Sequence, residues 1–302
     1  KKEGQYFNKS YYNNIINFDS DVYYLNDKGE KKLLLKFRKN VIPNKKCKQA
    51  YEALYKVAQK SNRNRGAAAG IIKTKKLPNY AKNIKTKHKF RVFYTNKKGT
   101  LKRDNIGNKS MSNIIGYYDR PDRNHYRKFK KSPKLLCRTT AFTKKEVNKW
   151  KKTLPLILEA NKQFKKLVPN RYIVQYKRAS QTPKFQIKNT AFSTITTNYN
   201  WRTACHKDKG DLMEGFGNLI VLEKDKCGYS CPSYQGCYLG FPAFKVCVDV
   251  RQGDFLAMDV HQWHANTPLY ETEEDKKYNE TITSDFKDNP EVRTAGLYQK
   301  YT

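Results

Sequence analysis

The chain from Arg171 to its end follows a strand pattern that restricts the fold more than any other feature. Short apolar or alternating runs are separated by turn residues, and no helical periodicity intervenes. The runs are RYIVQY, TAFSTITTN, NLIVLE, FKVCVDV, DFLAMDV and RTAGLYQKY. Such a succession of short strands predicts a closed or sandwiched antiparallel β architecture.

Helices and further strands are predicted before this region, so the expected fold class is α+β. KKLLLKFRKN at 31–40 and KTKHKFRVFY at 85–94 alternate apolar and basic residues, as half-buried strands do. Helical spacing predicts a helix over about 45–60. The SNRNRGAAAG segment after it is expected to be a mobile loop, in which Arg63 and Arg65 contact phosphate or remain solvated.

A second helix is predicted from Thr143 to Leu167. Thr143 as N-cap and Glu146 three residues later form a capping box, and apolar residues continue at helical spacing. Pro155 within this run is expected to kink the helix or to divide it into two.

Positive charge is concentrated in the first part of the chain. The net charge is +35; residues 1–200 contain 50 Lys and Arg against 11 Asp and Glu, whereas residues 201–302 contain 12 against 16. This excess predicts an acidic polymer such as nucleic acid as partner. The alternative is a lysine-rich composition caused by biased nucleotide usage, since Asn and Tyr are abundant too.

The apolar segments and cysteines point to an intracellular protein. No apolar run approaches the roughly 18 residues of a membrane span, and the first residues lack a signal-peptide core. Seven Cys, an odd number, favour reduced thiols or metal ligands over a disulfide framework. Cys227, Cys231 and Cys237, completed by Cys205 or Cys247, are a candidate structural zinc site, and the alternative is a hairpin with idle thiols.

A His-x-Asp pair follows the predicted strand TAFSTITTN. In an extended segment, residues two apart project to the same face, so the side chains of His206 and Asp208 stand side by side. His264, which follows the strand FLAMDV, completes a set of two His and one carboxylate, the facial triad of non-haem iron(II) oxygenases. His261 is the competing ligand, because it precedes His264 by only three residues.

Seven collinear segments extend the signal beyond the triad: SNIIGYYDR, CRTTAFT, FKKLVPNRYIVQY, NTAFSTITTN, HKDKGDLMEGFGNLIVLE, VDVRQGDFLAMDVHQWHANTP and RTAGLY. From about residue 112 to its end, the chain resembles the TET/JBP family of nucleobase oxygenases, which use iron(II) and 2-oxoglutarate. The resemblance implies a double-stranded β-helix (jelly-roll) core and assigns His206, Asp208 and His264 as iron ligands and catalytic residues. It also places at Arg293 the guanidinium that binds the far carboxylate of 2-oxoglutarate.

Two departures leave the co-substrate open. Asp211 and Ala191 resemble an algal branch of the family that uses ascorbate and leaves a glyceryl group on 5-methylcytosine, although Asp211 is equally a turn or N-cap residue. Ala265 stands where the family has Gly after the second His. Asn198 is expected to orient a ligand of the metal centre, and Asp211 to contact the co-substrate.

The predicted reaction is oxidation of the 5-methyl group of a flipped base in DNA, with 5-methylcytosine favoured over thymine. Ala191, Phe192 and Tyr199 are the candidate substrate-binding residues, the last two as aromatic groups that stack on a base. The alternatives are the ascorbate reaction, a hydroxylase of protein or RNA, and a reader of modified bases without turnover.

The predicted organisation is a basic N-terminal region, 1–110, with DNA-binding and core-supporting elements, followed by the β-helix oxygenase core at 111–302. No linker marks this division. The expected partner is DNA, double-stranded and with a flipped methylated base, and neither a membrane nor an obligate protein partner is expected. The expected location is the nucleus or wherever the DNA substrate lies.

Overall fold

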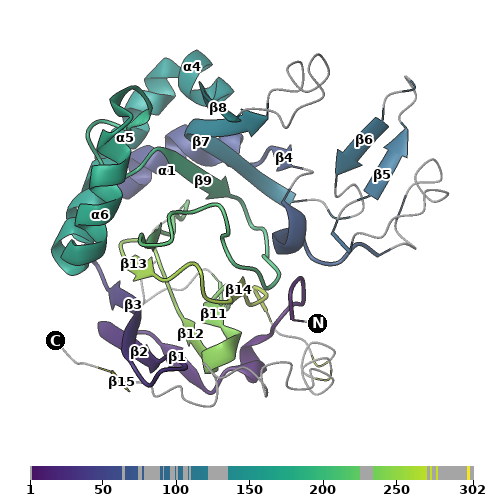
Figure 1. Cartoon of the computed structure of the whole chain (residues 1–302), viewed down its shortest axis with the longest axis vertical. Coiled ribbons are helices and arrows are strands. Elements are labelled where there is room, and N and C mark those ends of the chain that lie inside the picture. The colour runs from purple at the N-terminus through teal and green to yellow at the C-terminus, as the bar shows by residue number, and fades with distance from the viewer. Residues whose placement is uncertain are drawn as a thin grey trace.

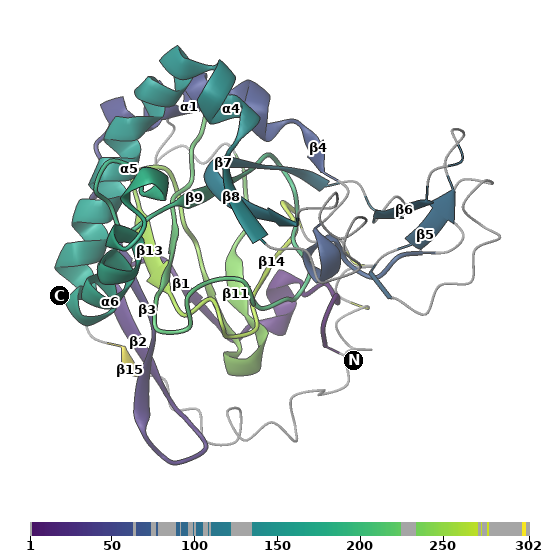
Figure 2. The same cartoon turned by 45° about the horizontal axis from the view of Figure 1, so that its top comes forward.

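The fold mixes helices and sheets, in agreement with the α+β prediction (Figure 1). The computed structural model describes residues 2–62, 65–73, 77, 89–90, 92–95, 99, 101–104, 108, 110–121, 135–224, 234–270, 273, 277 and 298–299. Figures 1 and 2 show the helices α1, α5 and α6 gathered on one side of the strands, and the β5–β6 hairpin projecting from another side.

Two sheets combine strands from both ends of the sequence. The first has the order β1-β12-β11-β14 and the second the order β10-β13-β3-β2-β15. The first consists of β1 (Asn14–Ile16), β12 (Val246–Val248), β11 (Leu239–Phe241) and β14 (Ala265–Asn266). The second consists of β10 (Gly217–Leu219), β13 (Phe255–Met258), β3 (Lys31–Arg38), β2 (Ser20–Leu25) and β15 (Tyr298–Gln299). The first 40 residues therefore build the same sheets as the last 100.

A third sheet carries the strand that leads toward the His-x-Asp pair. Its order is β4-β7-β8, and β9 pairs with β7. The strands are β4 (Ser61–Asn62), β7 (Ser110–Pro121), β8 (Leu135–Thr139) and β9 (Thr194–Asn198), and a separate hairpin is formed by β5 (Val92–Thr95) and β6 (Leu101–Asp104).

The helices lie between and beside these strands along the chain. They are α1 (Asn44–Ala58), α4 (Ala141–Lys145), α5 (Val147–Leu167) and α6 (Pro169–Ser180), with 3-10 turns η1 (Lys9–Tyr11), η2 (Gly66–Ala69), η4 (Pro183–Phe185) and η5 (Pro242–Phe244). Within the described residues, no helix is both long enough and apolar enough to span a membrane.

Strand β13 separates two hydrophobic cores, and its alternation explains why FLAM is apolar throughout. Leu256 and Met258 point into the core between the first two sheets, whereas Phe255 and Ala257 point into the core beneath the helices. All four residues of the strand are buried. The strand that precedes His264 is thus fixed by packing on both of its faces.

Most predicted elements are confirmed with shorter bounds. The helix over 45–60 is α1, and the basic run 31–40 is β3. Strands β9, β12 and β13 lie within TAFSTITTN, FKVCVDV and DFLAMDV, and β15 lies within RTAGLYQKY. Strand β10 overlaps NLIVLE but begins one residue before it, at Gly217. Of the run 85–94, the described strand residues are Val92–Tyr94 in β5.

The prediction of a strand at RYIVQY was wrong. These residues form α6, which begins with Pro169 at its first turn and buries Tyr172 against the helical core. The β-branched pair Ile173-Val174 suggested a strand, but both side chains are exposed on the helix. The proline fixes a helical φ at the N-terminus, and this outweighs the modest helix penalty of β-branched residues.

The start of the second predicted helix was also wrong by several residues. Thr140 is the N-cap, because its hydroxyl accepts a hydrogen bond from the Thr143 N–H, and the short helix α4 ends at Glu146. Thr143 instead accepts a hydrogen bond from the Gly116 N–H of β7 at 2.8 Å. Helix α5 then runs through Pro155 without a break, so the division into two helices is not found there.

A buried carboxylate ties α1 to α5 and should make stability depend on pH. Glu159 accepts hydrogen bonds from Lys46 at 2.6 Å and from Gln163 at 2.9 Å. Burial alone would raise the pKa of Glu159, but these hydrogen bonds outweigh it and hold the pKa below its ordinary value. The stabilisation is therefore complete above the unfolded-state pKa and is lost as the pH falls through the folded-state pKa.

We expect Glu159→Gln to lower the free energy of unfolding by about 1–2 kcal/mol at pH 7. The difference from the wild type should shrink as the pH falls below 4.5, the ordinary pKa of a Glu side chain. Urea denaturation at several pH values measures it. Lys162→Gln is the matched control, because Lys162 lies 3.9 Å from the same carboxylate but is 73% exposed. An equal effect of both variants would contradict the role of the Lys46 contact.

Candidate metal centre

The two predicted histidine ligands are joined through their backbones. His206 and His264 form an isolated antiparallel bridge, in which each backbone N–H donates to the other's carbonyl at 3.0 Å. His264 directly precedes β14, which pairs with β11. Directly opposed residues of an antiparallel bridge project to the same side, so the two imidazoles face together and their ring centroids are 4.3 Å apart.

Segments from the N-terminal region hold the strand that carries His206. The Gly4 N–H donates to the Cys205 carbonyl at 2.8 Å, and the Cys205 N–H donates to the Gln5 carbonyl at 2.7 Å. One residue earlier, the Ala204 N–H donates to the Ala68 carbonyl at 2.9 Å. The position of His206 therefore depends on residues about 140–200 positions before it in the sequence.

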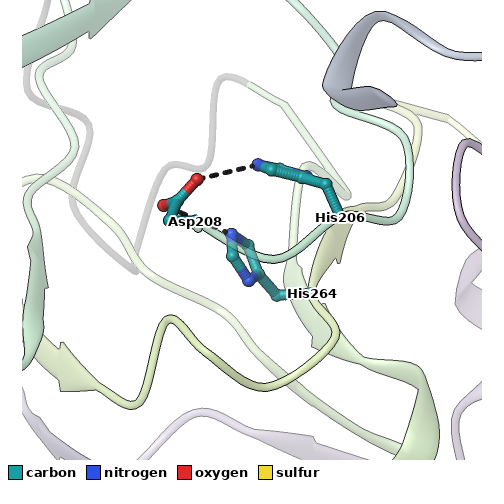
Figure 3. A group of neighbouring side chains, drawn as sticks. All are labelled: His206, Asp208 and His264. Atoms are coloured by element: carbon teal, nitrogen blue, oxygen red, sulfur yellow. Dashed lines mark ion pairs between the residues drawn. The ribbon is translucent and has the colours of Figure 1, made fainter. Parts of the chain in front are cut away.

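Asp208 brings its carboxylate to both imidazoles (Figure 3). Its Oδ1 lies 3.5 Å from His206 Nε2, and its Oδ2 lies 3.7 Å from His264 Nε2. The backbone N–H of Asp208 donates to the Val260 carbonyl at 3.0 Å, which anchors the residue to the chain just after β13. The three residues offer ligand atoms that all lie within 4.8 Å of one another.

Hydrogen bonds on the far side of each ring determine which ring nitrogen carries the hydrogen. The other nitrogen then directs its lone pair toward the Asp208 carboxylate. His206 Nδ1 lies 2.7 Å from the Ala204 carbonyl, and His264 Nδ1 lies 3.0 Å from the Gln262 carbonyl. A carbonyl oxygen only accepts, so each Nδ1 carries the hydrogen and each neutral ring presents an unprotonated Nε2. This is the arrangement that orients a metal-ligating histidine.

The charge state of His206 also suits a ligand. Burial, followed by the adjacent His264, lowers the pKa of His206 to about 4, although Asp208 opposes the shift. The imidazole is therefore neutral at pH 7, and metal ions bind the neutral form.

One side of the group is open to solvent. The Asp208 side chain is 41% exposed, whereas the His206 and His264 side chains are 15% and 5% exposed. Two imidazole nitrogens and one carboxylate on a single side match the donor set of non-haem iron(II) oxygenases, which leaves further coordination positions for other ligands. The residues present thus fit a divalent iron ion.

His261, the competing ligand, is turned away from the group. Its Nε2 donates to the Leu212 carbonyl at 3.1 Å, and its backbone N–H donates to Asp259 Oδ1 at 3.0 Å. The turn that contains His261 therefore supports the loop after Asp208, while His264 faces His206.

Arg65 is a cation beside the group that the sequence pattern did not single out as a site residue. It lies in SNRNRGAAAG, which was predicted to be a mobile loop. Among the described residues of that segment, Ser61–Asn62 form β4 and Gly66–Ala69 form a 3-10 turn with Ala68 and Ala69 buried. Burial lowers the pKa of Arg65, and the Asp208 carboxylate acts against this shift. Its guanidinium carbon lies 5.8 Å from the centre of the Trp201 ring.

Arg65 also has an unused donor. Its Nε is buried and has no hydrogen-bond partner among the described residues. A buried guanidinium donor without a partner is costly, and a carboxylate is the group that satisfies it best. The surroundings of the triad thus fit an acidic co-substrate such as 2-oxoglutarate.

The predicted co-substrate residues differ in their surroundings. Asp211 lies in the turn after Asp208, and its backbone N–H donates to the Asp208 carbonyl at 3.2 Å. Partial burial and the Asp208 carboxylate raise the pKa of Asp211 to about 6. Asn198 is exposed at the end of β9, opposite Ser112 of β7. Arg293 lies outside the described residues, and the roles of all three stay predictions.

The predicted substrate residues make contacts within the protein. Ala191 is buried, and its carbonyl accepts a hydrogen bond from Gln175 of α6 at 3.1 Å. The ring of Phe192 stacks on Phe164 with centroids 6.2 Å apart. Tyr199 meets the edge of Tyr55 at 5.5 Å. Their part in binding a base stays a prediction.

The candidate zinc site receives no support from the described part of the chain. Cys227 and Cys231 lie outside it, and Cys237 is half-buried. Burial raises the pKa of both Cys205 and Cys247 to about 12, which disfavours the thiolate that zinc requires. Among the described residues, the triad is the only group of three or more metal-ligand side chains within bonding range.

Comparison with known proteins connects this geometry to a family. The profile of the Tet_JBP family, described as the oxygenase domain of the 2OGFeDO superfamily, matches residues 123–283. Thymine dioxygenase JBP1-B of Trypanosoma cruzi (strain CL Brener) is 31% identical over 206 residues, which are 67% of this chain and 22% of that protein. Thymine dioxygenase JBP1 of Trypanosoma brucei brucei is 29% identical over 218 residues, 71% of this chain and 23% of that protein.

A third relative carries an additional activity in its name. The bifunctional helicase and thymine dioxygenase JBP2 of Leishmania braziliensis is 30% identical over 161 residues, 53% of this chain and 13% of that protein. The chain thus spans less than a quarter of the length of each of these relatives. Because the family profile covers more than half of the chain and the matched region contains the whole His–Asp–His group, the chain belongs to the TET/JBP family of dioxygenases.

Proposed function

We propose that the protein oxidises the 5-methyl group of a pyrimidine base in DNA, with iron(II) and 2-oxoglutarate. The observation that carries the proposal is the convergence of His206, Asp208 and His264, with both Nε2 atoms turned toward the carboxylate and one side open. The two imidazoles and the carboxylate are the proposed iron ligands and the proposed catalytic residues.

Iron and 2-oxoglutarate together supply the oxidation of a C–H bond by dioxygen, in which 2-oxoglutarate leaves as succinate and carbon dioxide while the methyl group becomes hydroxymethyl. The protein binds and orients the reactants. The Ala204 and Gln262 carbonyls hold the imidazoles in the ligating tautomer. Arg65 offers a guanidinium for a co-substrate carboxylate, and Arg293 is the predicted partner of the other carboxylate.

A base must leave the duplex to bring its methyl group to this centre. Flipping a base costs a few kcal/mol, which contacts with phosphates and stacking in the pocket must offset. The basic first 200 residues supply the cations, and Ala191, Phe192 and Tyr199 are the proposed substrate-binding residues. We expect the substrate to be double-stranded DNA, so the protein acts wherever that DNA lies.

Two lines of support disagree on which base is the substrate. The sequence analysis favours 5-methylcytosine, whereas the relatives are named thymine dioxygenases. Both bases present a methyl group at the same ring position in the major groove. The proposed reaction is common to both, and a direct comparison of the two substrates decides between them.

We also infer that the two sheets around β13 form the double-stranded β-helix of the family. The shared core of β1, β2, β3, β11, β12 and β13 supports a sandwich of this kind. In this proposal, residues 111–302 form the oxygenase core, and residues 1–110 supply core-supporting strands together with DNA-binding elements. The pairing of β3 with β13 and of β1 with β12 supports the first of these two roles.

The ascorbate reaction is the second candidate. Asp211 and Ala191 resemble the algal branch of the family in sequence, and Asp211 lies in the turn directly after Asp208. A hydroxylase of protein or RNA would share the triad without needing the duplex. The assay below detects the ascorbate reaction directly, and unchanged duplexes in it would direct the search to protein or RNA substrates.

The test is turnover of defined duplexes by the iron(II)-loaded protein. Duplexes with 5-methylcytosine or thymine as the only candidate base are incubated in air with 2-oxoglutarate or ascorbate, and nucleosides are measured by mass spectrometry. We expect a hydroxymethyl product that requires 2-oxoglutarate. A glyceryl adduct with ascorbate would establish the second candidate, and unchanged duplexes under all four conditions would reject nucleobase oxidation.

A further inference from the structure

An open groove lies along α6, apart from the residues of the triad. It has a volume of about 810 Å³ and is lined by side chains of α5, α6 and the loop after η4, among them Lys165, Tyr172, Ile173, Tyr176, Lys177 and Asn189. Two cations, two phenol rings and an amide therefore meet in one concave surface. Among the described residues, no carboxylate lines it.

The floor of the groove is aromatic. Tyr172 is buried, and its ring stacks on that of Tyr176 with centroids 5.6 Å apart and an interplanar angle of 21°. The ammonium group of Lys165 lies 5.9 Å from the centre of the Tyr172 ring. Ile173 is 61% exposed at the edge. An aromatic floor with cations beside it is the combination by which proteins hold nucleic-acid strands without reading sequence.

The segment of the chain that contributes the groove is rich in basic residues. Residues 141–190 contain 13 Lys and Arg but only two acidic residues, Glu146 and Glu159. Both acidic residues are paired within the protein, Glu146 with Lys149 at 2.8 Å and Glu159 with Lys46 at 2.6 Å. The charge that remains on this segment is positive, so the complementary occupant is a polyanion.

The rim of the groove is built by a loop in an unusual conformation. Lys188 and Asn189 both have positive φ, 43° and 57°, although neither is glycine. Conformations of this kind persist where the surroundings hold them, and they gather at functional sites. Here the Thr190 hydroxyl donates to the Ile187 carbonyl at 2.7 Å, and Gln186 Nε2 donates to the Thr190 carbonyl at 3.0 Å.

The same loop continues toward the metal centre. After Thr190 it passes Ala191, whose carbonyl accepts from Gln175 of α6, and then enters β9. Gln175 Oε1 also accepts from the Phe216 N–H at 3.1 Å, beyond the turn that follows Asp208. Helix α6 therefore bears the groove on one surface and contacts two segments that flank the His-x-Asp pair.

We propose that this groove binds the sugar–phosphate backbone of the DNA substrate, outside the nucleotide that enters the metal centre. The proposal rests on the proposed function for the identity of the polymer. Lys165 and Lys177 contact phosphates, and the half-buried Tyr176 contacts sugars and bases, while the buried Tyr172 ring supports Tyr176. Such contacts position DNA without reading its sequence, because every sequence presents the same backbone.

The test compares two variants with the same change in charge. Lys165→Gln/Lys177→Gln removes two cations from the groove, whereas Lys151→Gln/Lys152→Gln removes two exposed cations from the first half of α5, outside the groove. Binding of a fluorescent methylated duplex is measured by anisotropy from about 50 to about 300 mM salt. We expect the groove variant to raise Kd about tenfold near 0.1 M salt and to make the salt slope shallower by about two.

The control variant should change Kd by less than about twofold. An equal loss of DNA affinity in both variants would contradict the proposal, because it would mean that only the overall positive charge of the protein affects binding. An unchanged Kd in both would overturn it too, and would leave an acidic protein as the candidate occupant. Turnover gives an independent readout: the groove variant should raise KM for the duplex and keep kcat, and a loss confined to kcat would contradict a positioning contact outside the centre.

Failure of the proposed function is recognised separately. Asp208→Ala removes a proposed iron ligand and should leave DNA binding intact, so the difference in Kd between groove and control variants must persist in that background. If the wild type oxidised no base but this difference remained, the proposed function would fail and the groove would stand. If the wild type oxidised a base but groove and control variants had the same Kd, only the proposal of a DNA-binding groove would fail.

Discussion

Asp208→Ala is expected to remove metal binding at the triad and to lower turnover by about a thousandfold or more. Its carboxylate faces both Nε2 atoms, at 3.5 and 3.7 Å, so its loss leaves two neutral imidazoles and no anionic ligand. The side chain is 41% exposed, so the fold should tolerate alanine at this position. Metal binding is measured by anaerobic titration with manganese(II), followed by electron paramagnetic resonance, and turnover by nucleoside mass spectrometry.

His261→Ala is the matched control for this prediction. It removes an imidazole three residues from His264, but one whose Nε2 donates to the Leu212 carbonyl. We therefore expect it to keep the metal affinity within about threefold, with a modest effect on turnover through the loop after Asp208. Loss of the metal in His261→Ala together with its retention in Asp208→Ala would refute the assignment of the ligands.

The sequence was sufficient to group the triad because its members obey local rules. His206 and Asp208 are two residues apart in an extended segment, and His264 follows a strand whose apolar run identified it. What the sequence left open was the choice between His261 and His264, since a turn of three residues separates them. In the structure, a backbone bridge brings His264 rather than His261 opposite His206. No pattern of residues within either segment encodes such a pairing.

The fold was less predictable where long-range pairing decides the structure. Strand β3 was predicted as a strand, but nothing in KKLLLKFRKN indicates that it pairs with β13, more than 200 residues later. In the same way, the N-terminal residues Gly4 and Gln5 hydrogen-bond to Cys205 beside the first histidine. The division at residue 110 followed the start of the family resemblance near residue 112, and a resemblance confined to the later residues does not record which earlier strands pair with them.

Helix α6 illustrates a local signal that was misread. Ile173 and Val174 have strand propensity, yet the helix exposes both and buries Tyr172 instead. A helix that exposes two β-branched residues gains little from propensity and depends on its packing, here on the stacked pair Tyr172–Tyr176 and on the hydrogen bonds of Gln175.

Arg65 was missed as a site residue for a related reason. It precedes GAAAG in a segment that was predicted to be a mobile loop, whereas these small residues permit a close backbone approach: the Ala68 carbonyl accepts a hydrogen bond from the Ala204 N–H. A run of small residues next to a charged one is a signal of close packing as well as of a loop. That packing brings the guanidinium into electrostatic contact with Asp208 and His206.

Arg65→Gln is expected to raise KM for 2-oxoglutarate about 100-fold, because truncating one partner of a buried charged contact costs several kcal/mol. The buried Nε without a partner gives the reason: the guanidinium has a donor available for a carboxylate. Arg65→Lys should recover little, since an ammonium group cannot reproduce a planar, bidentate contact. The measurement is the dependence of turnover on 2-oxoglutarate at saturating duplex, with Arg178→Gln, an exposed arginine of α6, as control.

The same variant separates the co-substrate role proposed for Arg65 from the phosphate contact that the sequence allowed. If the guanidinium binds the co-substrate, KM for 2-oxoglutarate rises while Kd for the duplex, measured without iron, stays nearly constant. If it binds a DNA phosphate, the duplex Kd rises instead and the salt slope becomes shallower by about one. The burial of Nε favours the first outcome, because a phosphate contact at the surface would leave the guanidinium accessible to water, and the second outcome would place the duplex within reach of the open side of Asp208.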